Sequence, residues 1–489
     1  MLTPLTKEER ERMKEPKPPS KNEIKKAKRA EKKELRKTRG KNKNKKGKVE
    51  SLKRIQEDAA GLDIGISEIW ACVPEDRDDP NVRSFKTFTA DLCKLAEWLE
   101  ECSVKTVAME STGVYWIPIF EILDERGFEV NLVNARQIKN VPGKKTDIMD
   151  CQWIQQLHSY GLLSASFRPD EEMAALRQLV RNRAMLIKYR AVHIQHMQKS
   201  IEMMNVKLGT VIRDITGKTG MKIIRAIVAG ERDGVRLAQY RDPRCFSSED
   251  EIAKSLEGNY KEEHVFALTQ ALGLYDFYGD KIEECDREIE KRYLCSAFYE
   301  TNKRELPPLE KKRPSNFKNK PAYDLRSHLY NLCGVDLTEI DGIDALTAQT
   351  VISEVGLNMD KWKSVKHFTS WLGLCPCNKI TGGKVFYRGS KTVGNKAALA
   401  LRVAARSLHR SKSGLGAYYR RMRAKHGSLK ANLAAAHKVA RIIYSMLKGK
   451  EPYKDPGEVY YLEKYRSRIV GNMTRQAAAL GYELVKKAE

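Results

Sequence analysis

Short apolar segments alternate with amphipathic ones between residues 56 and 165. Several segments are short and rich in β-branched residues, which is typical of strands. A first strand within 59–69 turns and returns through 70–73, and further strands are predicted at 83–88, 104–109 and 128–133. Others repeat apolar residues at helical spacing: 91–101, 115–126 and a segment from Thr146 to about His158. This alternation predicts an α/β domain over 56–165.

Four acids stand at defined places in this pattern. Asp63 lies inside the first strand, Glu110 ends the strand 104–109, and Asp147 and Asp150 fall in the first turn of the last helix, three residues apart and so on one face. An unpaired carboxylate inside an apolar strand is costly. Converging carboxylates are what a pair of magnesium or manganese ions needs for phosphodiester chemistry. The order strand, strand, helix is that of RNase H-like nucleases; coincidental surface acids are the alternative.

Charge is distributed unevenly along the chain. Residues 361–450 contain 21 Lys or Arg and no Asp or Glu, although the whole chain carries 64 acids. The net charge of +26 has the same sign. A long one-signed stretch is the electrostatic footprint of a polyphosphate, which predicts DNA or RNA as partner. The alternative is a solvated basic face.

The 489 residues allow several domains. Residues 1–55 are predicted to be a basic flexible arm that attracts RNA or DNA, or else a solubilising tail. The remaining divisions, each set by composition or helical spacing, are a helical or coiled-coil region, 166–296, with an insertion near 205–260; a Pro- and Lys-rich linker, 297–335; a mostly α DNA-binding domain, 336–450; and a C-terminal tail, 451–489.

Two long amphipathic helices are predicted in the middle region, at 170–204 and 266–296. They indicate an antiparallel helical arm or an oligomerisation stalk, or else ordinary packing within a helical core. The composition of 205–260 indicates no function for the insertion.

The ten cysteines are scattered, and the close pair Cys375 and Cys377 lacks the further ligands of a zinc site. No apolar run has the length of a signal sequence or a membrane span. We therefore expect reduced cysteines, a cytoplasmic location and no membrane partner.

A glycine-rich loop at 378–390 is the densest motif in the basic stretch. Gly382 and Gly383 permit close backbone approach to a phosphate, and Thr381 or Ser390 offers a hydroxyl. A hydroxyl beside glycines is usually a turn residue, so spacing alone does not assign a nucleophile. At 341–344, Asp-Gly-Ile-Asp indicates either a helix-hairpin-helix phosphate contact or a plain helical turn.

Basic residues in and after this loop are the predicted nucleic-acid contacts. Tyr418 and Tyr419 stand among them and add aromatic faces for base stacking. The predicted contacts are Lys384, Arg388, Lys391, Lys396, Arg402, Arg406, Arg420, Arg421 and Arg423.

These residues resemble those of the DEDD-type insertion-sequence transposases, relatives of the pilin-gene invertase. The phrases that carry the resemblance are Gly-Leu-Asp-Ile at 61–64, Met-Glu-Ser-Thr-Gly-Val-Tyr-Trp at 109–116, Lys-Thr-Asp-Ile-Met-Asp at 145–150, Trp-Leu-Gly-Leu-Cys-Pro at 371–376 and Gly-Ala-Tyr-Tyr-Arg-Arg at 416–421. The resemblance implies a RuvC-like N-terminal domain and a C-terminal transposase domain that contains a catalytic serine.

By this resemblance, Asp63, Glu110, Asp147 and Asp150 bind magnesium, and the serine before Gly-Gly-Lys attacks DNA. Here Thr381 stands at that position, and its β-branch restricts the χ1 rotamer. Either Thr381 replaces the serine, Ser390 is the nucleophile, or this copy has lost strand transfer. The resemblance also implies a structured guide RNA and a homo-oligomer, a dimer or tetramer.

The sequence thus predicts a recombinase that moves an insertion sequence. One alternative is a RuvC-like endonuclease for branched DNA, which needs the four acids but no hydroxyl nucleophile. A second alternative is a non-catalytic nucleic-acid-binding protein, in which Asp63→Asn changes no activity and no divalent-ion binding.

Overall fold

The computed structural model describes residues 53–111, 113–138, 146–297, 306–308, 319–382, 384–390 and 394–485. The chain divides after Phe167 into two compact units. All but the last three residues of the predicted basic arm at 1–55 lie outside the described residues. Lys391 also lies outside them.

The first unit is built on a five-stranded mixed sheet with the strand order β3-β2-β1-β4-β5. Strands β1, β2 and β3 form an antiparallel meander, whereas β4 and β5 continue the sheet parallel to β1. The strands are β1 (Ala59–Ile64), β2 (Glu68–Cys72), β3 (Val82–Lys86), β4 (Thr106–Glu110) and β5 (Glu129–Val133). Each corresponds to a predicted strand, and the sheet fits an RNase H-like α/β domain.

Helices cover the two faces of this sheet. Leu62 of β1 and Met109 of β4 point to one face, where they pack against Leu95 and Leu123 of two helices. Ala108 points to the other face and packs against Ile154. The helices are α3 (Thr89–Glu101) and α4 (Trp116–Glu125) on the first face, α6 (Asp147–Ser159) on the second, and the short α5 (Ala135–Ile138). The predicted helices at 91–101, 115–126 and 146–158 are confirmed.

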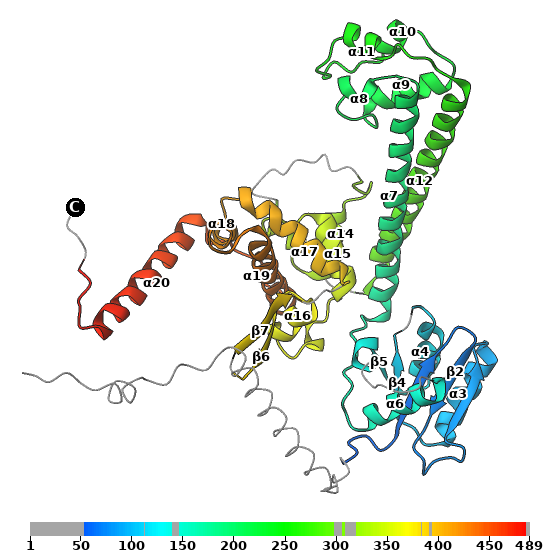
Figure 1. Cartoon of the computed structure of the whole chain (residues 1–489), viewed down its shortest axis with the longest axis vertical. Coiled ribbons are helices and arrows are strands. Elements are labelled where there is room, and N and C mark those ends of the chain that lie inside the picture. Colours follow the sequence, from blue (N-terminus) through cyan, green and yellow to red (C-terminus); the bar gives the residue numbers. More distant parts are fainter. Residues whose placement is uncertain are drawn as a thin grey trace, which may run out of the picture. The chain divides into compact units, whose positions relative to one another are not determined.

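The second unit begins with an antiparallel pair of long helices, α7 (Glu171–Met203) and α12 (Glu262–Leu294), which Figure 1 shows side by side. The buried Arg183 of α7 pairs with the buried Asp286 of α12, and His193 stacks on Tyr278. The two predicted helices are therefore confirmed as an antiparallel pair, and their use as an oligomerisation stalk stays a prediction.

The predicted insertion at 205–260 connects these two helices in sequence and forms a small helical module. Ile223, Leu237 and Ile252 of the module are fully buried, in a core that also includes Met197 of α7 and Leu268 of α12. The module contains α8 (Leu208–Val211), α9 (Lys218–Val228), α10 (Gly234–Ala238) and α11 (Glu249–Ser255).

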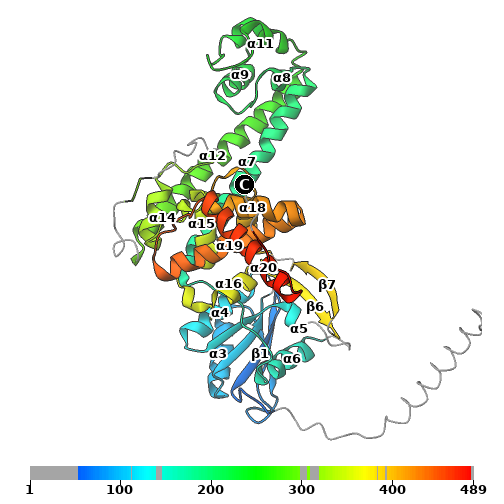
Figure 2. The same cartoon turned by 90° about the vertical axis from the view of Figure 1, so that its left-hand side faces the viewer.

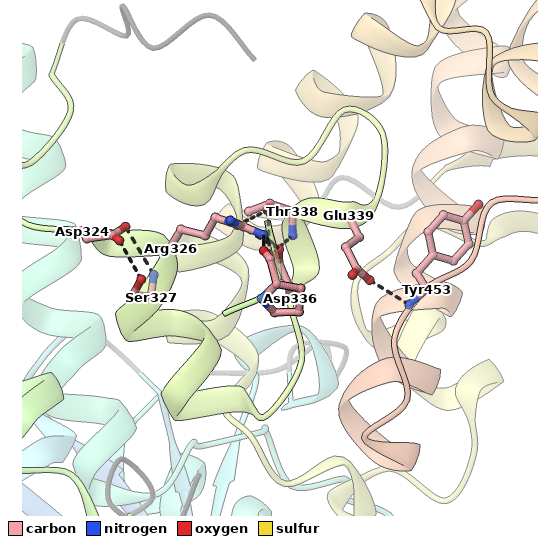
Figure 3. A network of polar contacts seen from close by, with 8 residues as sticks. Asp324, Arg326, Ser327, Asp336, Thr338, Glu339 and Tyr453 are labelled. Atoms are coloured by element: carbon pink, nitrogen blue, oxygen red, sulfur yellow. Dashed lines mark hydrogen bonds and ion pairs between the residues drawn. The ribbon is translucent and has the colours of Figure 1, made fainter. Parts of the chain in front are cut away.

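The predicted linker at 297–335 contains a helix, α14 (Leu325–Cys333), which corrects that prediction for its last third. Asp324 caps the helix by accepting a hydrogen bond from the Ser327 amide. Arg326 donates to the nearly buried carboxylate of Asp336 with its Nε at 2.9 Å (Figure 3). The prolines suggested irregular chain, but this ion pair and the buried leucines of α14 order the segment.

The rest of the second unit is mostly helical, with one β-hairpin. Its elements are η1 (Leu337–Glu339), α15 (Ala345–Val355), η2 (Met359–Lys361), α16 (Val365–Trp371), β6 (Pro376–Thr381), β7 (Lys384–Ser390), α17 (Lys396–Ser407), η3 (Leu408–Arg410), α18 (Gly414–His426) and α19 (Ser428–Gly449). At 341–344, Asp344 caps α15 by accepting from the Thr347 amide at 2.7 Å, and Gly342 packs against the carbonyl of Ala404. This supports a capped helical turn.

The predicted tail at 451–489 also has structure. The Tyr453 amide donates to Glu339 at 3.1 Å (Figure 3), and the Gly414 amide donates to Asp455. A helix, α20 (Glu458–Ala479), follows (Figure 2), and none of its residues is buried. Among the described residues, no helix is long and apolar enough to cross a membrane.

Candidate active site

Two of the four predicted acids lie on neighbouring parallel strands. Leu62 of β1 pairs with Met109 of β4, so Asp63 and Glu110 follow at the same level at the carboxyl ends of the two strands. Side chains alternate between faces along a strand. Asp63 therefore shares its face with Gly61, and Glu110 shares its face with Ala108, which is the face that α6 covers.

Helix α6 is held against this face by a very close backbone contact at Gly61. A β-carbon at residue 61 would lie 2.3 Å from the Gln155 nitrogen and 2.6 Å from the Cys151 carbonyl oxygen. The Gln155 side chain also donates to the Ala59 carbonyl at 3.1 Å, nearer the start of β1. The helix thus runs antiparallel to β1, and its first turn lies toward the strand's carboxyl end.

The other two acids lie in that first turn. Thr146 is the N-cap, and its hydroxyl accepts a hydrogen bond from the Met149 amide at 3.3 Å. Asp147 is exposed and Asp150 is half-buried. They precede Cys151 and Ile154 on the stripe of α6 that faces the sheet. The positive end of the helix dipole favours carboxylates here. All four acids consequently share one end of the sheet.

The pKa of the Cys151 thiol is affected by the negative charge of Asp63. A hydrogen bond with the Cys72 side chain raises the pKa of Cys151, and burial and the carboxylate of Asp63 raise it further. Cys72 of β2 pairs with Gly61 of β1, two residues before Asp63, and both thiols are buried. The Asp63 carboxylate therefore acts electrostatically on Cys151, the residue that directly follows Asp150 in α6.

The chemistry of this set fits a magnesium or manganese ion, because both prefer carboxylate oxygens. Among the described residues, however, no group of three or more Asp, Glu, His or Cys side chains has the spacing of a metal site. The fold brings the four carboxylates to one end of the sheet, but their oxygens do not gather into one coordination group.

Thr381 lies at the end of β6, where the β6–β7 hairpin turns. Thr381 pairs with Lys384, which leaves a two-residue connection, and Gly382 in it has a φ of +56°, which favours glycine. The side chains of Thr381 and Lys384 are exposed. The hydroxyl of Thr381 is thus open to a macromolecular substrate. Ser390 ends β7, but its side chain and that of Arg388 lie outside the described part of the structure.

Of the predicted nucleic-acid contacts, Lys384, Lys396, Arg406 and Arg423 are exposed. Although the Lys396 residue as a whole is exposed, partial desolvation of its ammonium group lowers the pKa of Lys396, and the nearby charge of Arg181 lowers it further.

Three other predicted contacts have partners within the chain. Arg402 donates to the Gly373 carbonyl at 3.3 Å, Arg420 binds the Ser411 carbonyl and pairs with Glu458, and Arg421 lies 4.3 Å from the ring centre of Tyr465. Arg420 and Arg421 thereby fasten α20 to α18, a role that the charge pattern did not indicate.

The packing role of Gly61 was also missed from the sequence. Its signal was nevertheless present, because a glycine inside a strand often marks a close approach of another backbone. Gly61 belongs to the same Gly-Leu-Asp-Ile phrase as Asp63. The residue that admits α6 thus stands two positions before the first acid.

Comparison with known families agrees with this arrangement. A model of DEDD transposases of the IS110 type matches residues 60–205, which include the four acids. A model of the transposase IS116/IS110/IS902 family matches residues 336–420, which include the hairpin with Thr381. No curated protein matches the chain. The chain is a member of the IS110 family of DEDD transposases.

Proposed function

We propose that this transposase moves its element by metal-assisted phosphodiester transfer, with a RuvC-like acid site and Thr381 as the hydroxyl nucleophile. The observation that carries the proposal is the placement of Asp63 and Glu110 at the ends of adjacent strands, beside the first turn of α6 with Asp147 and Asp150. Four carboxylates at one end of the sheet repel one another unless cations or protons offset their charge.

Asp63, Glu110, Asp147 and Asp150 would hold the magnesium or manganese ions. When bound, such ions polarise a phosphodiester and favour the ionised form of an attacking hydroxyl. The chain's own acids orient this site because two are fixed by the sheet register and two by a capped helix turn.

Thr381 would form the covalent bond to DNA. Its Oγ1 loses a proton and bonds to phosphorus, while the bond from phosphorus to one deoxyribose oxygen breaks and that oxygen takes a proton. The exposure of Thr381 beside a glycine turn supports this role, because glycines let a DNA backbone approach closely.

Covalent capture tests the proposal. The protein is expressed with the DNA that flanks its gene, the lysate is denatured, and residues that carry a nucleotide are mapped by mass spectrometry. We expect an adduct on Thr381 that persists in Thr381→Ser and is absent from Thr381→Ala and Asp150→Asn. Asp124→Asn, an exposed acid on α4, is the matched control and should retain the adduct.

The other outcomes separate the alternatives. An adduct on Ser390 would move the nucleophile along the same hairpin. Cleavage of element DNA without any adduct would indicate a nuclease that uses the acids alone. Neither cleavage nor adduct in wild type would leave a nucleic-acid-binding protein and contradict the proposal.

We further infer that a structured RNA guides the transfer. The acid-free basic stretch at 361–450 is compatible with RNA as well as DNA, and the resemblance to the DEDD-type transposases favours a guide RNA. Sequencing the RNA that copurifies with the protein from nuclease-limited lysate tests this. One abundant RNA encoded beside the gene is the expected result, and a random sample of cellular RNA would contradict it.

A further inference from the structure

The β6–β7 hairpin contains a bulge at Phe386. Thr381 pairs with Lys384 and Ile380 with Val385, but the next residue of β6, Lys379, pairs with Tyr387. Phe386 is therefore skipped by the ladder and is the extra residue on β7. Bulges of this kind re-aim a side chain and are frequent beside active sites.

The Phe386 side chain is 84% exposed, although it is one of the most apolar in the chain. Burying such a side chain contributes about 1.5–3 kcal/mol. A single exposed apolar residue is common on protein surfaces and needs no partner. Phe386 differs because a bulge presents it on the hairpin whose turn follows the proposed nucleophile.

Charge identifies the kind of partner that would cover Phe386. The hairpin lies within the acid-free stretch 361–450, and Lys384 is exposed at its turn. An aromatic ring among cationic side chains suits single-stranded nucleic acid, in which the ring stacks on a base while the cations neutralise phosphates. An apolar protein surface would gain nothing from this charge.

Spacing along the hairpin relates Phe386 to the attacked bond. Phe386 lies two residues beyond Lys384, the partner of Thr381, which is about 7 Å along the strand. Stacked bases rise by about 3.4 Å per step, so this length covers about two base steps.

We propose that Phe386 stacks on a base of the DNA strand that Thr381 attacks, within about two nucleotides of the reacting phosphate. The proposal rests on the proposed function for its choice of strand. It makes Phe386 a positioning residue, which holds the strand in place and does not touch the reacting atoms.

Tryptophan fluorescence tests the stacking without requiring the element's sequence, because every base has a π-face. Full-length Phe386→Trp is titrated with oligodeoxythymidylate and compared with wild type, whose own tryptophans give the baseline. The matched control is Ile380→Trp, since Ile380 lies on the same hairpin and is 64% exposed. We expect quenching at position 386 that exceeds quenching at position 380.

Affinity supplies the second measurement. Phe386→Leu should weaken binding of the same oligonucleotide about tenfold, the loss expected for one stacked base, whereas Phe386→Tyr and Ile380→Leu should bind like wild type. Equal quenching at both positions, or unchanged binding by Phe386→Leu, would overturn the proposal. Stronger quenching by oligouridylate than by oligodeoxythymidylate would also overturn it, in favour of an RNA base.

The result can be separated from the fate of the proposed function. If covalent capture finds no adduct on Thr381 but the fluorescence of Phe386→Trp is quenched, the hairpin binds DNA bases without the proposed nucleophile. If the adduct forms equally well in wild type and Phe386→Leu at every DNA concentration, the nucleophile stands and the positioning role of Phe386 fails.

Discussion

Gly61 of β1 and Gln155 of α6 approach so closely that a β-carbon at residue 61 would lie 2.3 Å from the Gln155 backbone nitrogen. The Gln155 nitrogen is a backbone atom, and the position of a β-carbon is fixed by its own backbone, so no side-chain rotation could relieve this clash. The contact sets how far α6 stands from the sheet. It therefore also sets where Asp147 and Asp150 lie relative to Asp63.

Gly61→Ala should displace α6 and lose both stability and activity. Overpacking in a well-packed interior costs about 1–3 kcal/mol, and we expect the upper part of this range because backbone atoms form the obstacle. Urea unfolding measures the loss of stability, and covalent capture measures the loss of activity.

Gly273→Ala on α12 is the control, because no heavy atom lies within 4 Å of the position that its β-carbon would take. Replacing a helix-interior glycine by alanine is expected to stabilise by about 1 kcal/mol. Equal stability of Gly61→Ala and wild type would contradict the packing described here.

The sequence predicted the first unit well because its signals are local. Strand and helix spacing located the five strands and three of the helices, including α6 with its start near Thr146. What the sequence did not predict depends on contacts between distant residues. Gly61 matters only because α6 returns to it, more than 80 positions later.

The second unit was predicted less completely for the same reason. The prolines of 297–335 suggested a linker, but Arg326 and Asp336 pair within the unit and order α14. Arg420 and Arg421 were interpreted as nucleic-acid contacts from charge alone, whereas Glu458 and Tyr465 of α20 engage them. Charge shows that a cation is present but not which group within the fold binds it.

The buried ion pair between Arg183 and Asp286 should make α7 and α12 sensitive to single substitutions. Arg183 donates to Asp286 at 3.1 Å through one nitrogen and to the Asn319 carbonyl at 2.8 Å. Asp286→Asn leaves a buried cation without its counter-charge, which costs about 3–5 kcal/mol. The thermal unfolding transition of the helical arm should fall accordingly.

The matched comparison is the double variant Arg183→Met with Asp286→Leu, which removes both charges and keeps apolar volume. It should lose less stability than Asp286→Asn, because no unpaired charge remains buried. A double variant less stable than the single one would show that the ion pair contributes net stability.

His158 should make the first unit lose stability in mild acid. Burial lowers the pKa of His158, whose Nε2 lies 2.9 Å from the Thr106 hydroxyl at the base of β4. The unfolded chain therefore takes up a proton at higher pH than the folded one. The neutral imidazole's contribution is complete above about pH 6.5 and is lost as pH falls below that value.

Urea unfolding across this pH range measures the effect. His158→Gln keeps a polar group near Thr106 but cannot titrate, so its stability should change less with pH than that of wild type. His367→Gln is the control, since His367 lies in the second unit and its replacement should leave the pH dependence of the first unit's stability unchanged. Identical slopes for wild type and His158→Gln would contradict this assignment.

Arg421 should affect the C-terminal helix more than it affects DNA binding. Its Nε donates to the Tyr461 hydroxyl at 2.9 Å, and its guanidinium lies over the ring of Tyr465, so it joins α18 to the first turns of α20. Arg421→Ala should make α20 sensitive to limited proteolysis while changing oligonucleotide affinity little.

The matched control is Arg423→Ala, because Arg423 is exposed two residues further along α18. It should leave α20 resistant to proteolysis, weaken oligonucleotide binding and reduce the salt dependence of binding by about one charge. If Arg421→Ala instead reduced the salt dependence and left α20 resistant, the guanidinium would contact phosphate, as the charge pattern alone suggested.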